Sequence, residues 1–143
     1  MLRMSQYHLW VDLKKPSMRN NKMDININLT INNKFVDTKV PVSKDMNLVD
    51  FFFSLQLLLK DVKVDNKCFS TFDIYTTAFE RIAIVGDNLE IYIAESFNKY
   101  ITVNDLFANN IDTLEVIAIN SPSVSKFLKE EKYLKEALDN YKF

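Results

Sequence analysis

The sequence has one cysteine, one histidine and one glycine among its 143 residues. Because Cys68 is alone, no disulfide can form within the chain, and a reducing compartment such as the cytoplasm is the natural setting. A lone cysteine most often behaves as a small apolar residue, so we expect Cys68 to be buried. The single glycine excludes the glycine-rich loops that hold nucleotide phosphates, since those motifs need several glycines.

The scarcity of histidine and cysteine also removes most catalytic and metal-binding chemistry. A nucleophile needs a base, and the only imidazole, His8, lies close to the N-terminus. A zinc site needs several Cys or His ligands. The aspartates are scattered through expected turns and helix starts, and no pair has the spacing of a metal site. We therefore predict that the protein is not an enzyme and has no catalytic residue, cofactor or metal ligand.

Neither sign of charge dominates, because 18 basic and 19 acidic residues leave a formal net charge of -1. Binding to a nucleic-acid backbone needs clustered Lys and Arg, so we expect no nucleic-acid partner. No stretch approaches the roughly 20 apolar residues that cross a bilayer, so we expect no membrane insertion. The partners are therefore expected to be proteins, and a homodimer is compatible with the sequence.

What the sequence does have is 48% hydrophobic residues, enough to build the core of one domain. We divide the chain into an N-terminal arm at 1–22, a folded domain at 23–120 and a terminal helix at 121–143. The arm contains an alternating apolar pattern that favours either an edge strand or an extended segment lying on the body or on a partner. Its apolar positions are Tyr7, Leu9, Val11 and Leu13.

The stretch INLTINNKFVDTKV predicts a β-hairpin. Apolar residues recur at every second position on both sides of Asn32-Asn33, and asparagine tolerates the positive φ of a tight turn. Pro41 cannot donate to a strand ladder, so the second strand should lie at an edge or end there. A second hairpin is expected from Arg81 to Ile93, with Gly86 supplying positive φ in its turn.

The helix expected after this first hairpin is unusually apolar, and its cap should be Ser43 or Asp45. One stripe at helical spacing, namely Leu48, Phe52, Leu55 and Leu59, should cover the sheet. Further apolar residues lie off this stripe, so either another element covers them or they bind a partner. With two other large residues they form our candidate protein-interaction set: Phe51, Phe53, Leu57, Leu58, Trp10 and Tyr133.

The C-terminal residues predict an amphipathic helix, capped by Ser121 with Pro122 in its first turn. Its apolar side chains recur at intervals of three and four, while KEEK occupies the outer face. Because the link to the preceding strand is short, we expect this helix to pack within the chain, with Leu134 and Leu138 against Phe51 and Leu58. A partner or a second copy is the alternative cover.

The remaining pattern includes a capping box at Thr102 and Asp105 and a last strand over 113–119. A hairpin, a long helix, further strands, a short helix and a closing strand predict an α+β fold of the β-grasp type, as in ubiquitin. Two segments carry a further resemblance: ININLTINNKFVDTKVPVSKDMNLVDFF and ITVNDLFANNIDTLEVI. They resemble the ubiquitin-like YukD/EsaB family of type VII secretion accessory proteins, although Ile111 stands where that family has glycine.

The resemblance implies a cytosolic accessory protein that acts by binding other proteins. Covalent tagging is not implied, because the chain ends in NYKF and lacks the paired glycines that conjugation uses. The alternative function is a small phage or mobile-element protein that binds and inhibits a host protein. The compact size and the surplus apolar helix surface favour that alternative.

Overall fold

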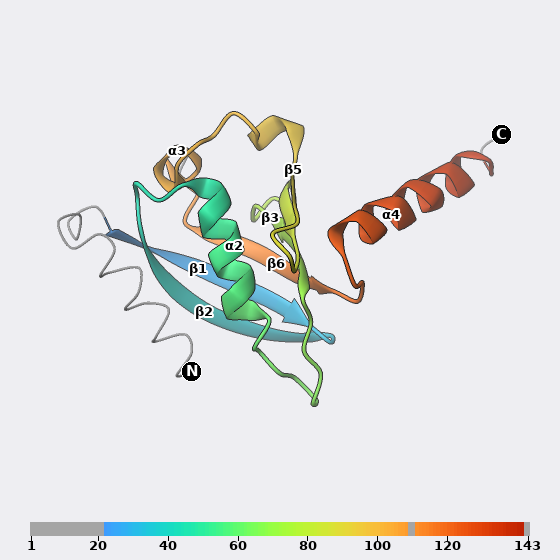
Figure 1. The fold of residues 1–143 in the computed structure, drawn as a ribbon, viewed down its shortest axis with the longest axis horizontal. Helices are drawn as coiled ribbons and strands as arrows, with labels where there is room; N and C mark the ends of the chain where they lie inside the picture. The colour runs from blue at the N-terminus through green and yellow to red at the C-terminus, as the bar shows by residue number, and fades with distance from the viewer. Residues whose placement is uncertain (1–21, 109–110, 142–143) are drawn as a thin grey trace.

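The computed structural model describes residues 22–108 and 111–141, which form a mixed six-stranded sheet with helices around it (Figure 1). The strands are β1 (Lys22–Ile31), β2 (Lys34–Ser43), β3 (Thr71–Tyr75), β4 (Arg81–Val85), β5 (Ile91–Ile93) and β6 (Thr113–Ile119). The helices are α2 (Leu48–Leu59), α3 (Val103–Phe107), α4 (Val124–Asp139) and the short 3-10 helix η2 (Glu95–Phe97).

The strand order across the sheet is β2-β1-β6-β3-β4-β5. The last strand, β6, inserts beside β1 and runs parallel to it, whereas every other pair of neighbours is antiparallel. A first hairpin, a helix across one face and a final strand that returns to the middle are the plan of the β-grasp, or ubiquitin-like, fold. The predicted α+β class is confirmed.

The first hairpin forms as its alternating pattern predicts. Asn32 and Asn33 have φ of 51° and 63°, the left-handed values that a two-residue hairpin turn requires. β2 pairs only with β1, so Pro41 lies on an edge strand, where its missing N–H interrupts no second ladder.

The core lies between α2 and one face of the sheet. Leu48, Phe52, Leu55 and Leu59 are all at most 1% exposed, so the predicted stripe does cover the sheet. The cap of α2 is different from the one predicted: Asn47 accepts hydrogen bonds from the backbone N–H groups of Val49 and Asp50. Ser43 cannot serve, because it is the last residue of β2 and pairs with Lys22.

The start of α3 confirms the predicted capping box. The Thr102 hydroxyl accepts from the Asp105 N–H at 3.2 Å, and the Asp105 carboxylate accepts from the Thr102 N–H at 2.9 Å. The carboxylate also accepts from the Ile101 N–H, and these backbone hydrogen bonds hold the pKa of Asp105 below its ordinary value. This local motif fixes the loop that closes the core next to Phe107.

The predicted packing of the terminal helix on α2 is wrong. Phe51 and Leu58 are 1% and 5% exposed within the main core, and Phe51 makes an edge contact with Phe107 at 6.2 Å between ring centroids. Leu134 and Leu138 instead remain 62% and 58% exposed, and α4 extends away from the sheet (Figure 1). The Phe51 side of α2, where α4 was expected, is covered by Phe107 of α3.

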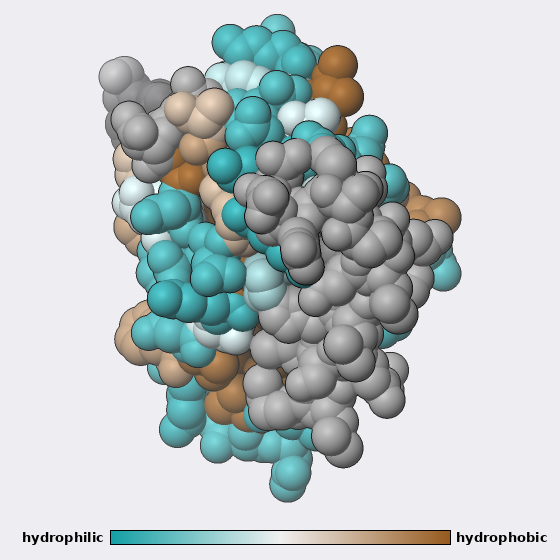
Figure 2. All heavy atoms as spheres, turned by 90° about the vertical axis from the view of Figure 1, so that its left-hand side faces the viewer, coloured by the Kyte–Doolittle hydropathy of each residue, from teal (hydrophilic) through white to brown (hydrophobic). Residues whose placement is uncertain are grey.

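Two further expectations can be compared with the described residues. Cys68 is exposed rather than buried, because it lies in the loop between α2 and β3. Of the arm predicted at 1–22, residues 1–21, with Trp10, lie outside the described residues, and Lys22 begins β1. The side of the molecule away from α4 is mainly hydrophilic over its coloured atoms, with hydrophobic residues in small separate patches (Figure 2). Among the described residues, none of the helices has the length and apolar character that a bilayer crossing requires.

Candidate protein-binding site

The largest group of exposed apolar side chains on one element is at the end of α4. Leu134, Leu138 and Tyr141 are 62%, 58% and 75% exposed, and we call these three residues the α4 face. Leu134 and Leu138 are four residues apart and lie on one side of α4, and Tyr141 follows just beyond the C-cap, Asn140. Phe127, one heptad before Leu134, is on the same side but partly buried. The α4 face is therefore the unburied continuation of the side by which α4 docks.

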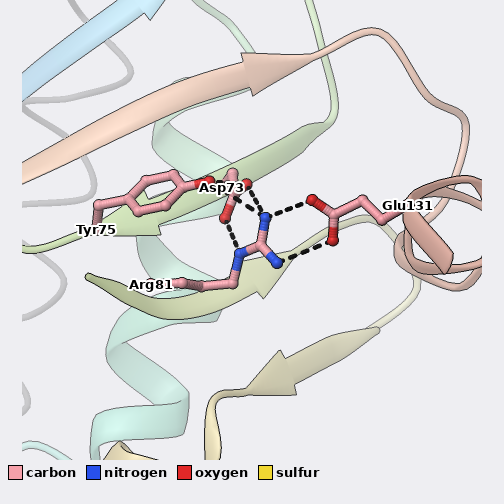
Figure 3. A network of polar contacts seen from close by, with 4 residues as sticks. All are labelled: Asp73, Tyr75, Arg81 and Glu131. Atoms are coloured by element: carbon pink, nitrogen blue, oxygen red, sulfur yellow. Dashed lines mark hydrogen bonds and ion pairs between the residues drawn. The ribbon is translucent and has the colours of Figure 1, made fainter. Parts of the chain in front are cut away.

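An ion network holds the second turn of α4 on the sheet (Figure 3). The Arg81 guanidinium donates to both oxygens of Asp73, at 2.9 and 2.7 Å, and to both oxygens of Glu131, at 2.9 and 2.7 Å. Asp73 is 1% exposed, and its neighbours Phe72 and Ile74 point into the core. Strand alternation therefore puts Asp73, and the docked turn of α4, on the sheet face away from α2.

Aromatic rings complete this network. The Tyr75 hydroxyl donates to Asp73 at 2.6 Å, and burial together with this bond raises the pKa of Tyr75. The Arg81 guanidinium lies 5.6 and 5.8 Å from the ring centroids of Tyr75 and Phe127. The pKa of Arg81 is raised, chiefly by its hydrogen bonds to Glu131. Arg81 thus stays charged and links a buried carboxylate of β3 to a carboxylate of α4.

A second anchor holds the beginning of α4. The Glu90 carboxylate accepts from the Val124 N–H at 2.7 Å, from the Ser125 N–H at 3.2 Å and from the Ser125 hydroxyl. The helix is capped by Ser123, whose side chain accepts from the Lys126 N–H, and not by Ser121 as predicted. The Ser121 hydroxyl instead donates to the Ser123 carbonyl. With Glu131, this anchor fixes two points of α4 that are about two helical turns apart.

Gly86 is needed for the approach of α4 rather than for its φ. No glycine among the described residues has positive φ, so the prediction that Gly86 uses it is wrong. A Cβ at Gly86 would lie 3.1 Å from Cγ2 of Val124 and 3.6 Å from Oγ1 of Thr71. Asn88 and Leu89 make the left-handed turn instead, with φ of 61° and 59°.

The Glu90 anchor should depend on pH. The pKa of Glu90 is lowered from its ordinary 4.5, chiefly by the hydrogen bond from the Ser125 hydroxyl. The Val124 and Ser125 N–H groups lower it further, whereas loss of solvation raises it. A lowered folded-state pKa means that the stabilisation is complete above 4.5 and is lost as the pH falls through the lowered value. We expect the first turn of α4 to loosen in that range, measured by NMR chemical shifts of residues 124–127. Glu90→Gln is the control, and an identical pH profile in both proteins would contradict this role.

A groove lies between α2 and the turn that joins β4 to β5. Its volume is about 390 Å³, and we call it the α2 groove; its lining is Phe53, Gln56, Leu57, Lys60, Gly86, Asp87, Asn88 and Leu89. Leu57 and Leu89 are 49% and 76% exposed. The charges at the rim satisfy one another, because Asp87 accepts from Gln56 at 2.9 Å and lies 3.7 Å from the Lys60 ammonium. The groove therefore combines apolar side chains with polar ones, and the two charges at its rim pair with each other.

Leu89 is a strained residue in this groove. Its φ of 59° is a left-handed value that costs an ordinary side chain about 1–2 kcal/mol, and glycine or asparagine usually takes such positions. Burial does not compensate for this strain, because the side chain is 76% exposed. Strained residues persist where the surrounding structure or a function requires them. Leu89 shares this combination of positive φ and exposure with Phe79, which is 65% exposed and does not line the groove.

The structure separates the predicted interaction residues into four groups. Phe51 and Leu58 lie in the core, so their prediction as surface contacts is wrong. Phe53 and Leu57 line the α2 groove together. Tyr133 is 65% exposed on α4 but lies next to, not within, the α4 face, and Trp10 lies outside the described residues. The sequence analysis did not predict the Arg81 network or the role of Leu89. The available signals were an arginine at the start of an apolar strand and a leucine directly after Asp-Asn in a turn.

The described residues contain no group of three or more His, Cys, Asp or Glu side chains placed to hold a metal ion. The Asp73, Arg81 and Glu131 network is fully occupied by its own ion pairs, which makes it a structural link.

Comparisons with known proteins add little to this picture. No family model matches the chain, and a search of curated proteins found no match. A solved structure described as "Solution Structure of the PB1 Domain of Cdc24p (Long Form)" aligns with a TM-score of 0.38 and 14% identity, covering 67% of this chain and 96% of that one. The β-grasp assignment rests on the strand order of this chain.

Proposed function

We propose that this protein is a non-catalytic protein-binding module that inserts the α4 face into an apolar groove of a protein partner. The observation that carries the proposal is the exposure of Leu134 and Leu138 on a helix that leaves the sheet, with the exposed Tyr141 just beyond its C-cap. Positions i, i+4 and i+7 are the anchor spacing by which amphipathic helices fill apolar grooves. Exposed apolar faces of this kind commonly mark interaction sites.

The two anchors of α4 support the same function. A short isolated helix is marginal in water, so a free segment of this length would lose entropy on binding. Here Glu90 and Arg81 hold the first half of α4 on the sheet, so that the second half continues from a folded template. The helix is thereby preorganised, which lowers the entropic cost of binding.

Quantitative affinity capture tests this function. The bait is the full chain, compared with Leu134→Ala/Leu138→Ala and with a control, Lys132→Ala/Glu136→Ala, on the opposite side of α4. We expect all three baits to fold equally and a defined protein to be lost only from the α4-face variant. Equal capture by the three baits would contradict the proposal.

The cellular system in which this binding takes place is a separate part of the proposal, and the sequence resemblance bears on its first candidate. An accessory role in a type VII-like secretion system is the first candidate. A phage or mobile-element inhibitor of a host protein is the second, favoured by the exposed apolar helix face. A secretion ATPase gene next to this gene would support the first, and tail or integrase genes would support the second.

A further inference from the structure

We infer that the outer edge of β5 is a further binding site, which pairs with an extended strand of a protein partner. The inference goes beyond the proposed function, because this edge belongs to the sheet and is separate from the α4 face. β5 (Ile91–Ile93) is the last strand in the sheet order and pairs only with β4. A partner strand would continue the sheet beyond β5.

The ladder to β4 fixes which backbone groups of β5 point outward. Ala94, directly after β5, donates its N–H to the Ile82 carbonyl at 2.9 Å. In an antiparallel pair every second residue bonds to the neighbouring strand, so Tyr92 faces β4 while Ile91 and Ile93 direct their N–H and C=O groups away from it. Among the described residues, none forms a hydrogen bond with these outward groups. Unpaired strand groups in this arrangement match the backbone of an extended peptide.

Partly buried apolar side chains lie along the same edge. Ile91 and Ile93 pair with Val85 and Ala83 of the core, so they share the α2 side of the sheet. Together with Phe53 of α2, they pack against the core but are only partly buried. The core is therefore incompletely covered at this edge, and a neighbouring strand with apolar residues on the α2 side would cover it.

The opposite edge of the sheet is protected against such pairing, whereas β5 is not. β2 carries the charged residues Asp37 and Lys39, and Pro41 offers no N–H. Charged side chains and proline are common devices that keep an edge strand from pairing with another chain. β5 has the sequence IYI, with neither a charge nor a proline. The contrast favours β5 over β2 as the edge that is open to a partner strand.

The occupant that fits is a short extended segment with apolar residues at alternate positions and a basic residue at one end. Its apolar residues would lie beside Ile91 and Ile93 on the α2 side. The basic residue is selected by Glu95, two residues beyond β5, which is exposed and forms no ion pair with a described residue. Because β5 is only three residues long, side chains must supply much of the selectivity.

Proline variants test the direction of the edge. Ile93→Pro removes an outward N–H, which an edge strand tolerates, so it should melt like Ile93→Ala, which loses the same side chain but keeps the N–H. Tyr92→Pro removes an N–H of the β4 ladder and should melt at a clearly lower temperature. An Ile93→Pro variant as unstable as Tyr92→Pro would show that the outward assignment is wrong and would overturn the inference.

A library of short random peptides displayed on phage is the ligand probe. The bait is the full chain, and sequences that bind Ile93→Pro equally well are discarded. We expect the retained sequences to have apolar residues at alternate positions and Lys or Arg at one end. Their synthetic peptides should bind Ile93→Pro about tenfold more weakly than Ile93→Ala, because one backbone hydrogen bond is lost. No retained sequence, or retained sequences without the alternation, would overturn the site.

Amide hydrogen exchange of the full chain shows whether the edge is free. The Ile91 and Ile93 amides should exchange rapidly in the protein alone and about tenfold or more slowly with a selected peptide, whereas the Tyr92 amide should be protected in both. Slow exchange of all three without peptide would mean that residues 1–21 or a second copy already occupy the edge, and it would overturn the inference. Leu134→Ala/Leu138→Ala should bind the peptides like the wild type, so failure of the α4-face proposal leaves this one standing.

Discussion

Replacing Arg81 with methionine should lower the free energy of unfolding by about 3–5 kcal/mol, the cost of removing one partner from a buried ion pair. Asp73 is 1% exposed and takes two hydrogen bonds from this guanidinium, at 2.9 and 2.7 Å. Methionine keeps much of the side-chain volume but removes both guanidinium hydrogen bonds from the Asp73 carboxylate, to which the Tyr75 hydroxyl still donates. Urea denaturation followed by circular dichroism measures the loss.

Two controls test whether Asp73 is the cause. Glu131→Gln changes the exposed arm of the network, where the carboxylate is 38% exposed, and should cost at most about 1 kcal/mol. Asp73→Asn in the Arg81→Met background removes the unpaired charge and should recover part of the stability. A loss below about 1 kcal/mol in Arg81→Met itself would show that solvent reaches Asp73 and compensates for the missing partner.

Replacing Phe52 with alanine should be as costly, about 3–5 kcal/mol, because it leaves a cavity in a core that cannot fully collapse. Phe52 is completely buried at the centre of the α2 stripe and packs beside Phe51, with 5.5 Å between the ring centroids. Thermal and urea unfolding of the purified variant measure the effect.

Leu134→Ala is the matched comparison for Phe52→Ala. Leu134 is also an apolar residue of an amphipathic helix, but it is 62% exposed. Its removal should therefore change the free energy of unfolding of the monomer by no more than about 0.5 kcal/mol. The measurement is made at concentrations where the chain is monomeric. A core-sized loss in Leu134→Ala would show that α4 packs within its own chain after all.

The function proposed here depends on how the fold uses its last helix. The β-grasp core is complete at β6, and its buried residues need no contribution from the second half of α4. Two charged anchors nevertheless hold the first half of α4 in one direction. We propose that this arrangement serves to present an apolar face to another protein.

Much of the architecture was predictable from the sequence because its determinants are local. The hairpin turn needs two residues that tolerate positive φ, and Asn32-Asn33 supplies them. The α2 stripe depends on helical periodicity, and the α3 capping box on residues three apart. In each case the physical cause lies within a few residues, so the pattern alone determined the element.

Local patterns failed where a residue chooses between neighbours that are distant in the chain. Periodicity puts Phe51 and Leu57 off the α2 stripe alike, yet only Phe51 is covered, because α3 packs on that side. Likewise the α2 groove needs a turn about 30 residues beyond α2 to fold back beside it; the Gln56 to Asp87 hydrogen bond spans 31 positions.

The direction of α4 shows the same division most clearly. The sequence by itself determined that residues after Ser123 form an amphipathic helix, since spacing of three and four is a local property. Which side of the sheet receives that helix was decided by Arg81 and Glu131, which are 50 positions apart, and by the close approach that Gly86 permits. These contacts form only when β3, β4 and the turn after them are in register. No short-range sequence pattern determines how far apart these residues lie in the folded chain, so the sequence alone could not predict the contacts.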